Sequence, residues 1–191
     1  PPMPAGAEDG IKRGLYALYH SQSKAKARVQ LIGAGAILRE TIKAAEILES
    51  QFDVAADVWS ATSFAELRRD IETVERDNRL HPGAKAKQSY AQTCLADCEG
   101  PIIAATDYIK LVAEQIRPAL KGQDYHVLGT DGFGRSDTCE MLRDFFEVDA
   151  KMIAYTALKA LSDQGKFSQE KLKAAMKQLK IDSKRPDPRT Q

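Results

Sequence analysis

The sequence is poor in glycine, proline, cysteine and aromatic residues, and each scarcity excludes a class of protein. Its 12 glycines and 8 prolines in 191 residues are too few for a collagen-like or low-complexity chain, and 3 cysteines are too few for a disulfide framework. No apolar run approaches the roughly 20 residues of a membrane span. Basic and acidic residues nearly balance, at 28 against 27, so no strong field attracts nucleic acid or anionic lipid. We therefore expect neither a nucleic acid nor a membrane among the partners.

What remains is the composition of a soluble globular domain, with 43% hydrophobic and 29% charged residues. The odd number of cysteines, Cys94, Cys98 and Cys139, fits reduced thiols and a cytoplasmic location. Cys94 and Cys98 are not followed by a second Cys or His pair at ligand spacing. We therefore predict no metal site.

The beginning of the chain, Pro1-Pro-Met-Pro4, is typical of a linker and unlike a signal or transit peptide. We therefore expect residues 1–24 to be a linker and entry segment and residues 25–191 to form one α/β domain. A linker at the start favours a piece of a longer polypeptide, with a processed terminus as the alternative.

Strand and helix signals alternate along most of this domain. Short apolar or β-branched runs are separated by stretches with apolar residues at helical spacing, and the chain after Asp149 is helical throughout. Alternation of this kind predicts a three-layer α/β/α fold with a mostly parallel sheet of about five strands and a helical C-terminus. The strand candidates are Arg28–Gly33, Val54–Ala61, Pro101–Thr106 and Tyr125–Gly129.

Three helix starts are predicted from capping residues. Ser63-x-x-Glu66 and Asp137-x-x-Glu140 have the spacing of capping boxes, in which two side chains satisfy free backbone N–H groups. Asp107 is placed to cap a helix that begins at Tyr108.

The turn Gly33-Ala-Gly35-Ala-Ile-Leu38 follows a predicted strand and opens a helix, as a dinucleotide-binding turn does. Leu38 stands where that motif requires a third glycine or an alanine for close packing of helix on strand. We favour an ordinary connection, with nucleotide binding as the alternative.

The loop Thr130–Asp137 is the most distinctive local sequence, because two glycines alternate with charged and aromatic residues. Such a loop ahead of a helix can bind an anion. Alternatively Arg135 pairs internally with Asp131 and Asp137 and fixes the loop, and this is the interpretation we favour. Phe133 is then an anchor for a neighbouring domain or subunit. The candidate interface or structural residues are Asp131, Phe133, Gly134, Arg135, Ser136 and Asp137.

No catalytic constellation is evident. His20, His81 and His126 are far apart in sequence, and no Gly-x-Ser-x-Gly elbow or phosphate-binding loop is present. We predict no catalytic, cofactor-binding or metal-binding residue in this chain.

Four sets of motifs carry a resemblance to one family. They are Thr62-Ser-Phe-Ala-Glu-Leu67, Glu75-Arg-x-Asn78 with Leu80-His-Pro82, Thr106-Asp-Tyr-Ile-Lys-Leu111 with Glu114-Gln115, and Leu128-Gly-Thr-Asp-Gly-Phe-Gly-Arg-Ser-Asp137 with Phe146-Glu-Val-Asp149. On these residues the chain resembles the C-terminal domain of the homodimeric bacterial pyruvate dehydrogenase E1 component, a member of the transketolase superfamily. The similarity extends from Met3-Pro-x-Gly6 to Asp187-Pro-Arg189, where the family commonly has Asn-Pro-Arg.

The resemblance implies an enzyme that decarboxylates pyruvate with thiamine diphosphate and magnesium and acetylates the lipoyl group of dihydrolipoyl acetyltransferase, the E2 component. In that family the cofactor lies between the N-terminal and middle domains of a dimer. The resemblance therefore implies a noncatalytic segment that binds no cofactor alone and whose partners are the rest of the E1 chain, a second E1 chain and E2. The competing hypothesis is a stand-alone module that binds a nucleotide or anion at the Gly33–Leu38 turn or the Thr130–Asp137 loop.

Overall fold

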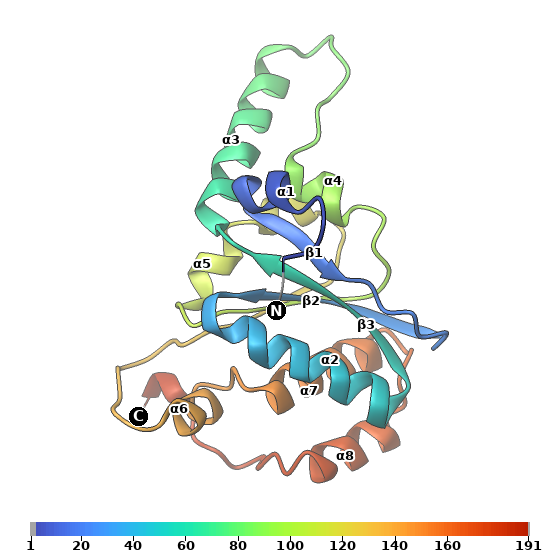
Figure 1. Ribbon diagram of the computed structural model, residues 1–191, viewed down its shortest axis with the longest axis vertical. Coiled ribbons are helices and arrows are strands. Elements are labelled where there is room, and N and C mark those ends of the chain that lie inside the picture. Colours follow the sequence, from blue (N-terminus) through green and yellow to red (C-terminus); the bar gives the residue numbers. More distant parts are fainter. Residues whose placement is uncertain (1–2, 191) are drawn as a thin grey trace.

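The computed structural model describes residues 3–190, so Pro1 and Pro2 of the expected linker lie outside the described residues. A five-stranded sheet in the order β1-β3-β2-β4-β5 forms the centre, and helices cover both faces (Figure 1). Strands β2 to β5 are parallel and β1 runs antiparallel to β3. The predicted α/β fold, with its mostly parallel sheet and helical C-terminus, is confirmed. The elements are α1 (Glu8–Arg13), β1 (Leu15–Tyr19), β2 (Ala27–Ala34), η1 (Gly35–Ile37), α2 (Leu38–Phe52), β3 (Val54–Ala61), α3 (Phe64–Leu80), α4 (Tyr90–Leu95), β4 (Ile102–Ala105), α5 (Lys110–Glu114), η2 (Arg117–Leu120), β5 (Tyr125–Leu128), α6 (Cys139–Phe145), α7 (Ala150–Asp163), α8 (Gln169–Gln178) and η3 (Pro188–Thr190).

The sheet separates two apolar cores because successive side chains of a strand point to opposite faces. Val29 and Leu31 of β2 pack with α2, α7 and α8, whereas Ile32 packs with α3 and α4 on the other face. Every residue of β3 is buried, as expected of a parallel strand covered on both sides. In Figure 1 the second half of α3 projects away from the sheet, with the chain of residues 81–89 returning beside it. None of the helices within residues 3–190 is long and apolar enough to cross a membrane.

Residues 8–19 differ from the expected entry segment. They form α1 and β1, and β1 pairs along β3 from Leu15 opposite Ala61 to Tyr19 opposite Val58. The pairing is long-range, so no local signal in this short aromatic stretch specifies it.

The helix starts confirm one capping prediction in part and correct two. The Ser63 side chain accepts a hydrogen bond from the Glu66 N–H (3.1 Å), as predicted, but the capping box is incomplete, because the Ser63 N–H donates to the Gly14 carbonyl and the Glu66 carboxylate pairs with Arg69. The cap of α6 is Thr138, one residue after the predicted Asp137, and its hydroxyl accepts from Met141. Asp107 caps no helix, because Asp107 and Tyr108 form a bend, Ile109 is the extended N-cap residue and α5 begins at Lys110.

Candidate functional site

The candidate site lies at the carboxyl edge of the sheet, where the strand order reverses. From β2 the chain moves to β3 on one side and to β4 and β5 on the other, and in open α/β sheets such a switch point is where ligands bind. The Thr130–Asp137 loop follows β5 and is fastened to the segment that follows β4. Thr130 donates from its backbone N–H to the Tyr108 carbonyl (2.9 Å) and from its hydroxyl to the Asp107 carbonyl (2.8 Å).

Asp131 performs the capping role that the sequence assigned to Asp107. Its carboxylate accepts a hydrogen bond from the backbone N–H of Lys110 (3.1 Å), the first residue of α5. The preceding Gly129 allows this approach, since a Cβ there would lie 2.7 Å from the Tyr108 carbonyl oxygen. Asp131 therefore locks the loop to α5.

The two glycines of the loop have different roles. Gly132 has a φ of +121°, and a Cβ on it would collide with the Pro188 carbonyl. Gly134 is not in the left-handed region, and a Cβ there would meet no atom within 4 Å. Only Gly132 is required by the observed packing.

The predicted Arg135 network with Asp131 and Asp137 is wrong. Asp131 binds the Lys110 N–H, and the Asp137 carboxylate accepts from the Thr138 N–H (2.7 Å). The Arg135 guanidinium lies over the Phe145 ring, 4.2 Å from its centroid. Backbone N–H groups thus bind both carboxylates, one from the distant Lys110 and one from the adjacent Thr138. Arg135 forms no ion pair with any residue between 3 and 190.

Large apolar side chains stand exposed along the same edge. Phe133 is 77% exposed, and Tyr108 and Leu111, from the segment to which the loop is fastened, are 62% and 68% exposed. We call Tyr108, Ile109, Leu111 and Phe133 the edge patch. Ser136 is exposed as well and lines a surface hollow with Arg135 and Asp137. Exposed apolar side chains on two segments joined by the hydrogen bonds of Thr130 favour a contact surface.

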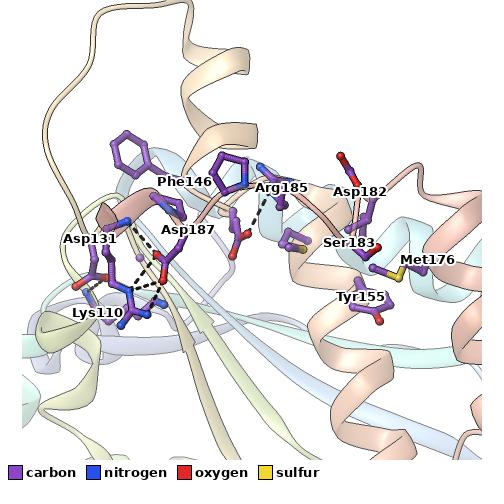
Figure 2. A pocket seen from close by; sticks show the side chains of 16 residues that line it. Lys110, Asp131, Phe146, Tyr155, Met176, Asp182, Ser183, Arg185 and Asp187 are labelled. Atoms are coloured by element: carbon purple, nitrogen blue, oxygen red, sulfur yellow. Dashed lines mark hydrogen bonds and ion pairs between the residues drawn. The ribbon is translucent and has the colours of Figure 1, made fainter. Parts of the chain in front are cut away.

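The C-terminal segment, residues 182–190, approaches the loop and lines an open pocket of about 440 Å³ (Figure 2). Arg185 pairs with Glu147 (3.2 Å) and donates to the Asp144 carbonyl, which ties the segment to the end of α6. Hydrogen bonds from Arg189 lower the pKa of Asp187 to about 2. No role is predicted for this segment from the sequence, although the two prolines in Arg185-Pro-Asp-Pro-Arg189 restrict its backbone.

A buried carboxylate behind the loop was also missed. Glu40 of α2 accepts from Arg143 of α6 (3.1 Å), from Lys43 (3.1 Å) and from the first backbone N–H of α7, that of Ala150 (3.2 Å). These contacts fix α6, and with it the end of the Thr130–Asp137 loop. The sequence signal was weak, because Glu40 resembles any polar residue of an amphipathic helix.

The remaining titratable candidates are dispersed. His20, His81 and His126 each lie beside a different aspartate, at 3.7, 3.3 and 2.7 Å. Burial raises the pKa of the Cys98 thiol to about 11 and raises that of Cys94. Within residues 3–190 no group of three or more His, Cys, Asp or Glu side chains is arranged to hold a metal ion.

Comparison with known families supplies the decisive observation. The model of the transketolase-like TK C-terminal domain matches residues 14–149, well over half of the chain. The chain belongs to this family. Among solved structures, this transketolase C-terminal domain is similar in fold to transketolases from Leishmania mexicana (TM-score 0.54, 15% identity) and Campylobacter jejuni (TM-score 0.53, 19% identity). The alignments cover 81% and 78% of this chain and 19% of each transketolase.

Relatives found by sequence have a higher identity to this domain than these two transketolases have. The domain is 51% identical over 188 residues to the pyruvate dehydrogenase E1 component of Pseudomonas aeruginosa and 45% identical over 189 residues to that of Escherichia coli K12. These matches cover 98% and 99% of this chain but 21% of each relative. The predicted resemblance is confirmed, and the chain spans about a fifth of the length of the curated relatives it matches.

Proposed function

We propose that this transketolase C-terminal domain is the C-terminal part of a bacterial pyruvate dehydrogenase E1 component. The observation that carries the proposal is identity near half along almost the whole chain to proteins of that name. The full-length protein then decarboxylates pyruvate oxidatively in the cytoplasm, as a homodimer that uses thiamine diphosphate and magnesium. It transfers the acetyl group to the lipoyl group of dihydrolipoyl acetyltransferase.

Within that enzyme we assign this domain a supporting role. As the family resemblance implies, the cofactor is assigned to other parts of the full-length chain, and within residues 3–190 no group of three or more His, Cys, Asp or Glu side chains is arranged to hold its metal ion. The edge patch provides the contact surface, because its exposed apolar side chains are costly to leave in water. They lie on the Thr130–Asp137 loop and on the segment after β4, to which Thr130 and Asp131 at the start of the loop are hydrogen-bonded. The domain thereby supports interdomain and dimer packing.

The intact mass of the natural polypeptide tests the assignment to E1. Because the chain spans 21% of its relatives, we expect a protein about five times as long. A natural polypeptide of 21.1 kDa, the mass of this chain, would contradict the assignment and favour the stand-alone binding module.

Titration calorimetry with thiamine diphosphate and magnesium tests the supporting role. We expect no saturable binding to this chain tighter than about 100 μM, which corresponds to roughly 5.5 kcal/mol. Tighter binding would place part of the cofactor site in this domain.

A further inference from the structure

A crevice of about 380 Å³ opens at the switch point between β2 and β4. Its floor is apolar, with Ile37 after β2 and Val148 before α7 almost fully buried and Leu142 and Phe146 beside them. The inner side of the Thr130–Asp137 loop forms one wall, while Phe133 is not part of the lining. A volume of this size accommodates a small organic molecule.

Two charged side chains that line this crevice form no hydrogen bond or ion pair with other residues in the range 3–190. Arg135 is exposed and makes no hydrogen bond or ion pair with residues 3–190, and its guanidinium lies over the Phe145 ring at the border with the neighbouring hollow. The exposed Asp107 carboxylate likewise has no hydrogen-bond donor or cation within bonding distance in that range, and it lies beside Gly35. The other cation of the lining, Arg143, is already paired with Glu40.

An anion-binding group and a hydroxyl-binding group therefore share one apolar crevice. A guanidinium that stacks on an aromatic ring keeps its N–H edge free for two parallel hydrogen bonds to phosphate. A carboxylate at the end of a parallel strand is suited to accept hydrogen bonds from sugar hydroxyls. The apolar floor suits the less polar part of the same ligand.

From this combination we propose that the crevice binds a hydroxyl-bearing phosphate ester of about mononucleotide size, with the phosphate on Arg135 and a hydroxyl on Asp107. The proposal does not rest on the assignment to E1, because every residue involved belongs to this chain. Nucleotides and sugar phosphates share this chemistry, and separate probes distinguish them.

Cys139 lines the crevice and provides the readout. It is exposed, whereas Cys94 and Cys98 are half-buried with raised pKa values, so alkylation reports selectively on Cys139. The alkylation rate is measured in the protein at its natural length, by mass spectrometry of the peptide that carries Cys139. The probes are adenosine monophosphate, ribose 5-phosphate, adenosine and inorganic phosphate.

We expect adenosine monophosphate to slow alkylation of Cys139 at least about threefold at millimolar concentration, an affinity of roughly 4 kcal/mol. Arg135→Gln should raise the concentration needed about tenfold, since it removes a charged hydrogen-bond donor pair. Arg79→Gln changes an exposed arginine of α3 that has no ion pair within residues 3–190, and should leave protection intact. Equal protection by ribose 5-phosphate would also support the site and identify sugar phosphates as sufficient ligands.

Asp107→Asn tests the hydroxyl-binding carboxylate, because it keeps the side-chain size and removes the charge. It should weaken the protection of Cys139 by both phosphate esters. The weaker protection that inorganic phosphate gives should be the same in this variant as in the parent. The proposal is overturned if neither ester protects Cys139 at about 10 mM, weaker than roughly 3 kcal/mol. It is equally overturned if adenosine monophosphate protects Cys139 in the Arg135→Gln variant as well as in the parent. Protection of the parent by adenosine as strong as that by its monophosphate would overturn it too.

Discussion

The carboxylate of Glu40 joins three helices, since it accepts from α6, from the start of α7 and from its own helix. Glu40→Ala leaves the Arg143 guanidinium and the Ala150 N–H without this partner in a mostly buried place. We expect the free energy of unfolding in urea to fall by about 3 kcal/mol. Glu46→Ala, an exposed position on the same helix, should change it by less than about 0.5 kcal/mol. Equal effects of the two substitutions would refute the role of Glu40.

Asp149 is the N-cap residue of α7, and burial makes its carboxyl group harder to ionise. Burial raises the pKa of its carboxyl, although the hydrogen bond from the Met152 N–H opposes the rise. The folded protein thus keeps a proton on Asp149 at a pH where the unfolded chain has lost it, and its contribution to stability falls as pH rises through that window. Asp149→Asn keeps the acceptor oxygen and does not titrate. The unfolding free energy of the variant minus that of the parent should increase from acid pH to about pH 7, and a decrease would contradict this account.

At the scale of elements, the C-terminal segment and the Thr130–Asp137 loop hold each other through one close approach, that of Gly132 to Pro188. Gly132→Ala introduces both an unfavourable φ and a collision, so we expect a loss of about 2 kcal/mol and faster hydrogen exchange in residues 185–190. Gly134→Ala is the matched control because it meets open space. If both variants exchange as slowly as the parent, the segment is held by other contacts.

How much of each element could be read from the sequence depends on where its stabilising partner lies. Val54–Ala61 was located to the residue, because a run buried on both faces needs no knowledge of its neighbours. The start of α5 was misplaced by two residues because its capping carboxylate, Asp131, comes from 21 positions along the chain. Strand β1 was missed for a similar reason, since its partner β3 alone defines it.

In the Thr130–Asp137 loop, too, the contacts of individual side chains could not be predicted from the sequence. The sequence identified Thr130–Asp137 as the distinctive feature, and of its two glycines the structure places only Gly132 in the left-handed region. It could not show that backbone N–H groups bind both aspartates, nor that Phe145 holds Arg135. Charge proximity in sequence suggested a pairing with Arg135, but backbone N–H groups of Lys110 and Thr138 occupy the two carboxylates.

At the scale of the whole molecule, the central claim is that the edge patch serves assembly and takes no part in the chemistry. The most direct test is Phe133→Ala in the full-length protein, with sedimentation and steady-state kinetics measured on one preparation. Loss of the exposed ring should weaken dimer or interdomain association about tenfold, and activity should fall only in step with the loss of assembled protein. Phe133→Leu, which keeps an apolar side chain, should retain assembly. A Phe133→Ala protein that stays fully dimeric at working concentration yet loses most of its kcat would contradict the account, because the loop would then act in the reaction itself.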